Sequence, residues 1–260
     1  MLELIDTHCH LTFEPLADDV PGVVGRSRDA GVSGWITVGT SIEDSRRAVA
    51  LAERYEGMYA SVGVHPHDAR LVDDAMLADL ETVARAGKVV AVGETGLDYH
   101  YNFSAPEEQK RVFAAHLELA AGLDLPVVIH CREAFDDTMA ILEGISALKR
   151  VVFHCFGGTA EQAHLVLERG YFISFTGVVT FKNAHKAREA VKVVPVDRLM
   201  VETDCPYMSP EPVRRQKPNE PALMTHTAAF LAALKGLNPE DFARETTKTA
   251  KTFFSLEPSA

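Results

Sequence analysis

The chain of 260 residues is long for one ordinary domain but normal for an α/β barrel, and it can bury a large core. Its composition, 47% hydrophobic and 24% charged, is that of a globular protein, and its formal net charge of −11 argues against tight electrostatic wrapping of nucleic acid. No apolar run approaches the roughly 20 residues that span a bilayer and no signal peptide is readable, so we expect a cytoplasmic protein with reduced thiols and no membrane partner.

Short β-branched apolar runs alternate with amphipathic stretches, which is the pattern of repeated strand–helix units. We expect strands at residues 2–7, 34–39, 58–64, 88–93, 125–130, 150–154, 170–175 and 198–203. Alternation without an interrupting linker predicts one parallel sheet, and a count of eight favours a single (β/α)8 barrel domain over residues 1–260. No GxGxxG motif follows the first strand, which weakens the dinucleotide-binding alternative.

Helix signals fill the gaps between these strands. Ser104 with Glu107, and Thr159 with Gln162, have the spacing of capping boxes and predict two helix starts. A helical tail is expected at the C-terminal end of the barrel, over residues 221–235 and 239–254.

In barrels of this class the catalytic groups come from the C-terminal ends of several strands. Six of the eight predicted strands deliver a His, Asp or Glu there: Asp6, His8, His10, His65, Glu94, His130, His154, Glu202 and Asp204. A lone histidine at such a place is more often a hydrogen-bonded core residue. Buried imidazoles and charges are costly unless they are paired or metal-bound, so the convergence favours a metal site. Imidazole and carboxylate together suit Zn²⁺, Mn²⁺ or Mg²⁺ at an open hydrolytic site.

Each of the four cysteines follows a candidate ligand directly, which raises the alternative of a cysteine–zinc site or of disulfides. Side chains alternate along a strand, so His8 and His10 should point the same way and Cys9 should point away. By the same argument Cys131 and Cys155 should face the helical layer. The alternative is that the strands bend at their ends, which would place Cys155 or Cys205 near the site. No CxxC pair is present, so a structural four-cysteine site is not expected, and we interpret the cysteines as small buried side chains.

Seven segments, in order along nearly the whole chain, make this sequence similar to the TatD family of metal-dependent hydrolases, often described as deoxyribonucleases. The segments are IDTHCHL (5–11), SVGVHPH (61–67), VGETGLDY (92–99), LPVVIHCREA (125–134), VFHCFGG (152–158), SFTGVVTFKNA (174–184) and VETDCPYMSP (201–210). One such motif is weak evidence, whereas seven in the family's order are highly specific. The family belongs to the amidohydrolase-like superfamily of (β/α)8 barrels, which agrees with the strand count.

The resemblance implies a site for two divalent metal ions, with Mg²⁺, Mn²⁺ and Zn²⁺ as candidates. His8 and His10 would be ligands of one ion. Glu94 would bridge both ions, where many related barrels use a modified lysine. His130 and His154 would hold the second ion.

Four further residues receive roles from the same resemblance. Asp204 would bind a metal and take the proton of the attacking water, although a strand-end aspartate can also simply cap the next turn. His65 and Glu202 look like accessory residues of the site. Arg132 resembles a substrate-phosphate contact, and from the residues alone a salt bridge to Glu133 or to a helix carboxylate is an equal alternative.

The segment RRQKPNEP (214–221) departs from the family pattern. The family usually has an arginine before its Asn-Glu-Pro, and here Pro218 takes that place. Arg214, Arg215 and Lys217 keep the local positive charge. The difference concerns phosphate recognition by this loop and not the metal site.

The predicted function is hydrolysis of DNA phosphodiester bonds by a metal-activated water at a two-metal site. The negative net charge does not exclude an enzyme that meets phosphate through metal ions and a few local cations. The alternative is a hydrolase of an amide, a lactone or a phosphotriester at the same site, since fold does not fix substrate. A non-enzymatic metal-binding or scaffold protein would not need an open coordination position. Tyr99, Tyr101 and Phe103 are candidates for base stacking, but packing beneath their loop is the simpler expectation.

Overall fold

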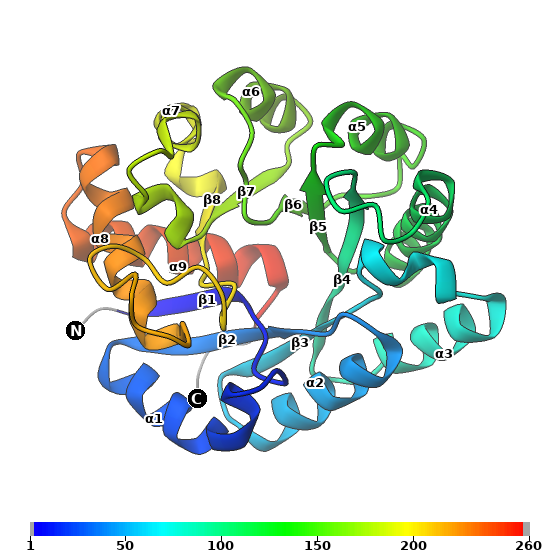
Figure 1. Ribbon diagram of the computed structural model, residues 1–260, viewed down its shortest axis with the longest axis horizontal. Coiled ribbons are helices and arrows are strands. Elements are labelled where there is room, and N and C mark those ends of the chain that lie inside the picture. Colours follow the sequence, from blue (N-terminus) through cyan, green and yellow to red (C-terminus); the bar gives the residue numbers. More distant parts are fainter. Residues whose placement is uncertain (1–2, 257–260) are drawn as a thin grey trace. The chain divides into compact units, whose positions relative to one another are not determined.

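The computed structural model describes residues 3–256, in which strands and helices alternate along the chain (Figure 1). The strands follow one another in one sheet in the order β1 to β8. Their bounds are β1 Leu4–Cys9, β2 Val32–Val38, β3 Met58–Val62, β4 Val89–Asp98, β5 Val127–Arg132, β6 Val151–Phe153, β7 Phe172–Phe175 and β8 Leu199–Val201. All eight predicted strands are present, and the predicted (β/α)8 class is confirmed.

Helices connect the strands and follow the last one. The α-helices are α1 Val20–Asp29, α2 Ile42–Arg54, α3 Asp74–Ala84, α4 Pro106–Leu123, α5 Phe135–Glu143, α6 Ala160–Glu168, α7 His185–Val193, α8 Met224–Lys235 and α9 Pro239–Phe254. Short 3₁₀ helices are η1 Leu16–Asp19, η2 Pro66–Leu71, η3 Gly177–Thr180, η4 Val196–Arg198 and η5 Pro221–Leu223. The helical tail is therefore confirmed. Within the described residues, no helix combines the length and the apolar character that crossing a membrane requires.

One of the two predicted capping boxes is confirmed and the other is wrong. At α6, Thr159 Oγ1 accepts a hydrogen bond from the Gln162 amide, and Gln162 Oε1 accepts one from the Thr159 amide. At α4 the carboxylate that caps the helix belongs to Glu108, which accepts from the Ala105 amide at 2.8 Å. Ser104 begins no helix, because its hydroxyl is used in tertiary bonds to η2.

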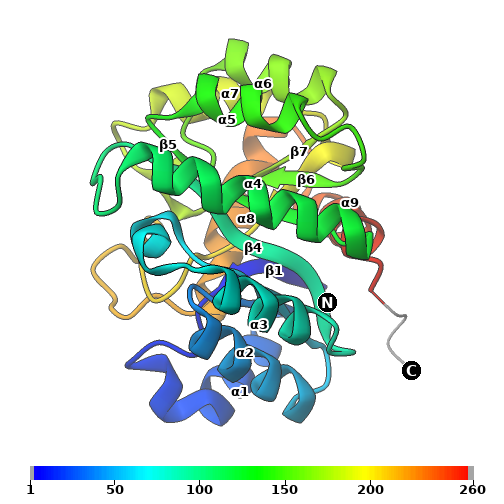
Figure 2. The same cartoon turned by 90° about the vertical axis from the view of Figure 1, so that its right-hand side faces the viewer.

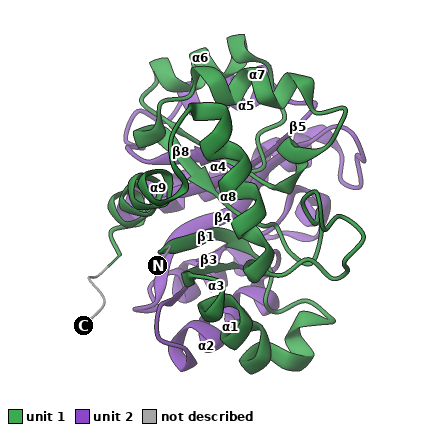
Figure 3. Cartoon of the chain, turned by 90° about the vertical axis from the view of Figure 1, so that its left-hand side faces the viewer, with its two compact units in different colours: residues 1–37, 155–260 green, residues 38–154 purple. Residues whose placement is uncertain are grey.

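The chain divides into two compact units, which are coloured separately in Figure 3. Unit 1 comprises residues 1–37 and 155–260, and unit 2 comprises residues 38–154. Within unit 1, β1 pairs in parallel with β2, and β7 pairs in parallel with β8. Within unit 2, parallel pairing runs from β3 through β4 and β5 to β6.

The core of unit 1 includes the end of the helical tail. Helix α9 packs on β1 and β8, and Phe253 is buried there with its ring 4.8 Å from that of Phe172. Trp35 of β2 is fully buried, and its indole N–H donates to the Ser27 hydroxyl of α1 at 2.9 Å. Burying one such aromatic side chain contributes roughly 1.5–3 kcal/mol. The tail therefore stabilises the strands that carry the N-terminal histidines.

In unit 2, helix α4 packs along β4 (Figure 2), and α2 packs on β3. Strand β4 is longer than predicted and continues to Asp98, so Glu94 lies within the strand. Gly96 pairs with His130 of β5 and has φ +138°, and a Cβ atom there would overlap the His130 carbonyl oxygen. Only glycine tolerates this backbone conformation and this close approach. The glycine thus brings β4 against β5 beside Glu94.

Candidate functional site

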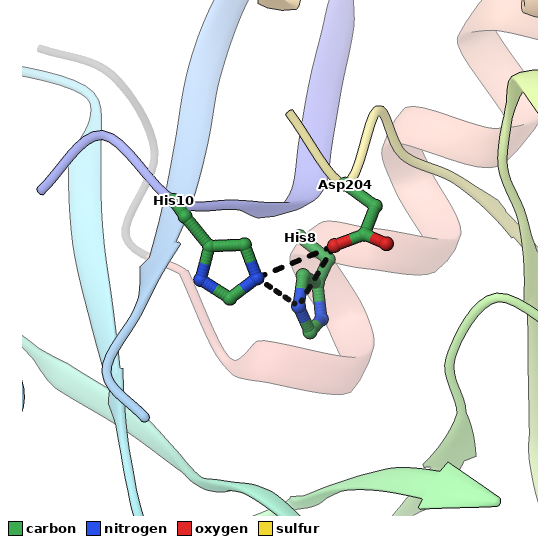
Figure 4. Close-up of side chains that lie close together, drawn as sticks. All are labelled: His8, His10 and Asp204. Carbon is green, nitrogen blue, oxygen red and sulfur yellow. Dashed lines mark hydrogen bonds and ion pairs between the residues drawn. The ribbon is translucent and has the colours of Figure 1, made fainter. Parts of the chain in front are cut away.

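The first polar group lies in unit 1 and consists of His8, His10 and Asp204, here called the unit 1 group (Figure 4). The two imidazole Nε2 atoms face each other at 3.2 Å. Asp204 Oδ1 lies 3.7 Å from His8 Nε2 and 3.3 Å from His10 Nε2. All three residues are buried. The predicted common orientation of the two histidines is confirmed.

Backbone hydrogen bonds join the segments after β1 and β8 and so hold the unit 1 group together. The His10 amide donates to the Cys205 carbonyl, and the Asp204 amide donates to the His8 carbonyl, both at 2.9 Å. Phe13 stacks on the His10 imidazole, with ring centroids 4.6 Å apart. These contacts fix the positions of the segments that carry the three side chains.

A buried carboxylate, Asp6, supports the same arrangement from β1. It accepts hydrogen bonds from the Thr203 amide (3.0 Å), the Thr203 hydroxyl (2.6 Å) and the His8 amide (3.3 Å). Burial raises the pKa of Asp6 to about 7, although these hydrogen bonds act in the opposite direction. Asp6 thus ties β1 to the residue that precedes Asp204.

Asn219 holds the turn that carries Asp204. Asp204 has a left-handed backbone conformation, with φ +53°. The buried Asn219 amide group donates to the Thr203 carbonyl at 3.1 Å and to the Tyr207 carbonyl at 2.6 Å, which lie on either side of Asp204. The asparagine of the Asn-Glu-Pro segment is therefore a clamp on this turn, a role that the sequence did not indicate.

The other residues of that loop have separate contacts. Glu220 accepts a bidentate hydrogen bond from Arg26 of α1, with its Oε2 2.8 Å from Nη2. Arg214 lies over the Phe181 ring at 3.9 Å. Pro218 stands where the family usually has an arginine. The neighbouring Asn219 still donates to the Thr203 carbonyl with proline at this position.

The second polar group lies in unit 2 and has a carboxylate at its centre. Glu94 Oε1 lies 2.8 Å from His130 Nδ1, 2.9 Å from His154 Nε2 and 3.6 Å from His65 Nε2. Glu94, His130 and His154 are called the unit 2 group below. Burial raises the pKa of Glu94, but the charges and hydrogen bonds of His154, His65 and His130 outweigh it and hold the pKa well below its ordinary range.

His65 lies beside Glu94 and His130, and the three together are close enough to hold a metal ion. His65 Nδ1 accepts a hydrogen bond from the His67 amide at 3.2 Å. The neutral imidazole then carries its proton on Nε2, the atom that faces Glu94. This supports the accessory role predicted for His65.

Asp98 is a functional candidate that the sequence reasoning missed. Its Oδ2 lies 3.0 Å from His130 Nε2 and 3.1 Å from His67 Nε2, and the residue is fully buried. Burial raises the pKa of Asp98, but hydrogen bonds from His130, Tyr101 and His67 outweigh it and hold the pKa well below its ordinary value. Strand alternation contained a signal, since Glu94 and Asp98 are four residues apart and share one face once β4 extends to Asp98.

Both groups fit a divalent cation. His130 donates its Nε2 proton to Asp98, so its Nδ1 lone pair faces Glu94 Oε1 at 2.8 Å. The lone pairs of His130 Nδ1 and Glu94 Oε1 repel each other at this distance unless a second proton on His130 or a cation lies between them. In the unit 1 group the facing Nε2 atoms and Asp204 pose the same requirement. Two imidazoles with one carboxylate form a donor set typical of zinc and related catalytic ions.

Glu202, predicted as accessory, is fixed by hydrogen bonds within unit 1. It accepts from the Ser174 hydroxyl and from the Cys155 amide, both at 2.6 Å. Its carboxylate therefore joins β7, β8 and the segment after β6. These hydrogen bonds indicate that Glu202 orients the segments around it.

Arg132, predicted as a phosphate contact, ends β5 and is exposed. Its guanidinium lies over the Tyr101 ring at 4.7 Å. The alternative salt bridge to Glu133 is not formed, because the Glu133 carboxylate lies 2.8 Å from His100 Nδ1. The Arg132 guanidinium thus lies on the Tyr101 ring, and its N–H groups can donate hydrogen bonds to a ligand.

The cysteines are free thiols, and three of the four are placed as expected. Cys9 Sγ points away from the histidines and donates to the Ile36 carbonyl at 3.3 Å, and burial raises the pKa of this thiol well above its ordinary value. Cys131 contacts Thr138 of α5, and Cys205 is buried. For Cys155 the prediction is wrong: with φ +45° the alternation of β6 has ended, and its Sγ contacts Thr176 at 3.3 Å.

Comparisons with known proteins identify the family of this chain. The sequence model of the family described as "TatD related DNase" matches residues 5–255. The "Uncharacterized metal-dependent hydrolase YabD" of Bacillus subtilis is 40% identical over 255 residues, which cover 97% of this chain and 99% of that protein. The "3'-5' ssDNA/RNA exonuclease TatD" of Cronobacter sakazakii is 38% identical over 96% of this chain and 97% of its own.

Solved structures show the same fold. The crystal structure of YjjV, a TatD homologue of Escherichia coli K12, has a TM-score of 0.91 and 32% identity, with 98% of each chain covered. A phosphotriesterase homology protein of Escherichia coli has a TM-score of 0.70 at 12% identity, which is a likeness of fold alone.

Proposed function

Because this chain belongs to the TatD family of metal-dependent hydrolases, we propose that it is a nuclease that cleaves phosphodiester bonds of DNA or RNA single strands. The observation that carries the proposal is the pair of imidazole–carboxylate groups. His8, His10 and Asp204 are close enough to hold one divalent cation, and Glu94 has the His130 and His154 imidazoles at 2.8 and 2.9 Å. The names of its relatives in Cronobacter and other bacteria, with 3′–5′ exonuclease action on single strands, support the same substrate class.

We assign one cation to His8, His10 and Asp204, and a second to Glu94, His130 and His154, with Mg²⁺, Mn²⁺ and Zn²⁺ as candidates. A divalent cation, when bound, supplies Lewis acidity that lowers the pKa of water and stabilises negative charge on phosphate oxygens. The bridging role of Glu94 stays a prediction from the family resemblance.

Asp204 is the proposed general base. Its Oδ1 faces both imidazoles of the unit 1 group, and the Asn219 clamp fixes the turn on which it lies. A carboxylate held in this way accepts the proton of the attacking water without first changing position. Glu202 and Asp98 hold their own neighbours in place and have no direct part in this transfer.

We also propose that the protein acts in the cytoplasm. The four free thiols agree with a reducing compartment.

The proposal is tested by removing bound metal with a chelator and restoring Mg²⁺, Mn²⁺ or Zn²⁺ singly. Cleavage is then followed on single-stranded DNA, single-stranded RNA and duplex DNA, each labelled at either the 5′ or the 3′ end. We expect restored cleavage of the single strands, with shortening from the 3′ end. Purified protein that cleaves no nucleic acid with any of the three ions would overturn the proposal. Hydrolysis of an amide, lactone or phosphotriester panel under the same conditions would replace it with the alternative hydrolase.

A further inference from the structure

Two aromatic side chains of unit 2 are exposed on the loop between β4 and α4. Tyr101 is 49% exposed and Phe103 is 60% exposed. Their rings stack on each other, with centroids 5.3 Å apart and planes 15° from parallel. The sequence reasoning favoured packing beneath the loop for both residues, and that expectation is wrong. Two stacked rings open to solvent need an explanation, because their burial would otherwise be favourable.

The loop holds these rings in place through its backbone. Asp98 Oδ1 accepts hydrogen bonds from the His100 and Tyr101 amides at 3.0 and 2.9 Å. The Ser104 hydroxyl donates to the His67 carbonyl at 2.7 Å, and the Ser104 carbonyl accepts from Gln109 of α4 at 2.9 Å. The rings are therefore displayed by an ordered loop, which lowers the entropic cost of binding a ligand.

The positively charged side chain of Arg132 completes the surface. The Arg132 guanidinium lies over the Tyr101 ring at 4.7 Å, and no carboxylate of residues 3–256 pairs with it. The neighbouring acid, Glu133, is held by His100 instead. A flat guanidinium on an aromatic face leaves its N–H donors for phosphate oxygens or base edges. Tyr101, Phe103 and Arg132 are called the aromatic platform below.

The platform is connected to the unit 2 group through one histidine. The His67 ring lies 4.8 Å from the Phe103 ring and 5.4 Å from the Tyr101 ring. The same imidazole contacts Asp98, the carboxylate that holds His130. The His67 and His130 rings are 6.3 Å apart. The His67 ring thus lies between the platform and His130 of the unit 2 group.

We propose that the aromatic platform binds an unpaired nucleobase of the substrate strand by stacking, while Arg132 contacts an adjacent phosphate. Stacking on a protein ring requires a base that has left its duplex, so the platform selects single strands and tolerates any base sequence. The proposal deepens the proposed nuclease function and rests on it. It assigns the single-strand preference to three named side chains and not to the metal groups.

The test measures binding of the metal-loaded protein to a fluorescent single strand of ten thymidines with phosphorothioate linkages, which slow cleavage. An abasic strand of equal length and charge serves as the second probe. We expect Phe103→Ala and Tyr101→Ala each to weaken binding of the thymidine strand by roughly 5- to 150-fold, with a smaller effect on the abasic strand. Arg132→Ala should weaken binding of both strands.

Matched variants separate stacking from a folding defect. Tyr101→Phe and Phe103→Trp keep a ring and should restore the affinity that the alanine variants lose. Leu165→Ala removes an equally exposed apolar side chain on α6 and should leave both affinities unchanged. Loss of affinity for both strands to the same degree in Phe103→Ala, or no loss at all, would overturn the stacking proposal.

The two proposals fail separately. A wild-type protein that cleaves single strands with added metal while Tyr101→Ala and Phe103→Ala retain full affinity contradicts the platform alone. A wild-type protein that cleaves no nucleic acid contradicts the proposed function, and the platform proposal with it.

Discussion

The unit 1 and unit 2 groups use the same kinds of side chain in opposite arrangements. In unit 1 two imidazoles face each other at 3.2 Å, and the carboxylate of Asp204 lies to one side. In unit 2 the carboxylate of Glu94 is the centre, and the imidazoles point at it. The His65 Nε2–H faces Glu94, but the His130 Nδ1 lone pair faces it too, and two facing Nε2 atoms share one proton at most. Each group therefore requires an added proton or a cation.

The two groups also differ in what fixes them. The unit 1 group lies on turns, which Asp6 and Asn219 hold by hydrogen bonds to the residues around Asp204. The unit 2 group lies on paired strands, where Gly96 allows close approach and Asp98 orients His130. The base is thus placed on a clamped turn, while the second ion's ligands belong to the sheet itself.

The largest effect is expected for Asp204→Asn. An amide keeps the shape and the hydrogen bonds of the turn but cannot accept the water proton, so kcat should fall by about 10²–10⁴-fold. Metal content, measured by elemental analysis after gel filtration, should fall by less than half, because His8 and His10 remain. An active variant would show that another group is the base. Glu211→Gln, at a partly exposed acid of the same loop region, serves as the control and should keep wild-type activity.

Asp98→Asn tests the unit 2 group in the same way. Asn cannot hold the His130 Nε2–H as a carboxylate does, so His130 loses its fixed orientation, and the affinity of one cation should fall about 10–100-fold. Calorimetric titration of the metal-free protein should then resolve one weakened and one unchanged site. The exposed Asp79→Asn provides the matched control. Equal weakening of both sites would show a general folding defect and contradict the orienting role.

A smaller effect, on stability, concerns His116 of α4. Its Nδ1 donates to the Val112 carbonyl and its Nε2 accepts from the Val64 amide, next to His65. Burial lowers the pKa of His116 from 6.5 to about 4. The unfolded chain therefore binds the proton first, and the stability that neutral His116 contributes is present above pH 6.5 and is lost as pH falls towards 4.

At pH 5 this loss amounts to about 2 kcal/mol relative to pH 7. Urea unfolding of the wild type and of His116→Gln at both pH values measures it. The variant should be less stable at pH 7 but should lose about 2 kcal/mol less on acidification. A pH dependence identical in the two proteins would show that other groups cause the acid lability.

The sequence predicted the architecture because strand alternation and helix caps are local signals. All eight strands and the histidine–carboxylate residues of both groups were found in this way, the latter with the help of the family resemblance. Asp98 escaped because strand β4 was expected to end at residue 93, before the alternation reached it. Asn219 was not predicted because it bonds to backbone carbonyls of a separate turn, those of Thr203 and Tyr207. Backbone contacts of this kind produce no recognisable pattern of residue spacing.

Alternation predicted Cys9 correctly and failed for Cys155, and the difference is a matter of backbone. Cys9 is the last residue of β1, so its side chain takes the opposite face from His8. Cys155 lies just past β6 in a left-handed conformation, where the period of two no longer applies. Periodicity arguments therefore end where the strand ends, and the residues of catalytic interest lie at that boundary.

The smallest effect is expected for Cys9→Ala, which tests whether a cysteine between two metal ligands takes part in binding. The Cys9 thiol contacts the Ile36 carbonyl, and its raised pKa keeps it protonated, whereas a metal ligand must be the thiolate. Metal content and kcat should match the wild type, with a loss of about 1 kcal/mol in unfolding free energy from the small cavity. Loss of stoichiometric metal from the folded variant would instead make Cys9 a ligand, and the unit 1 group would then need a different orientation of β1.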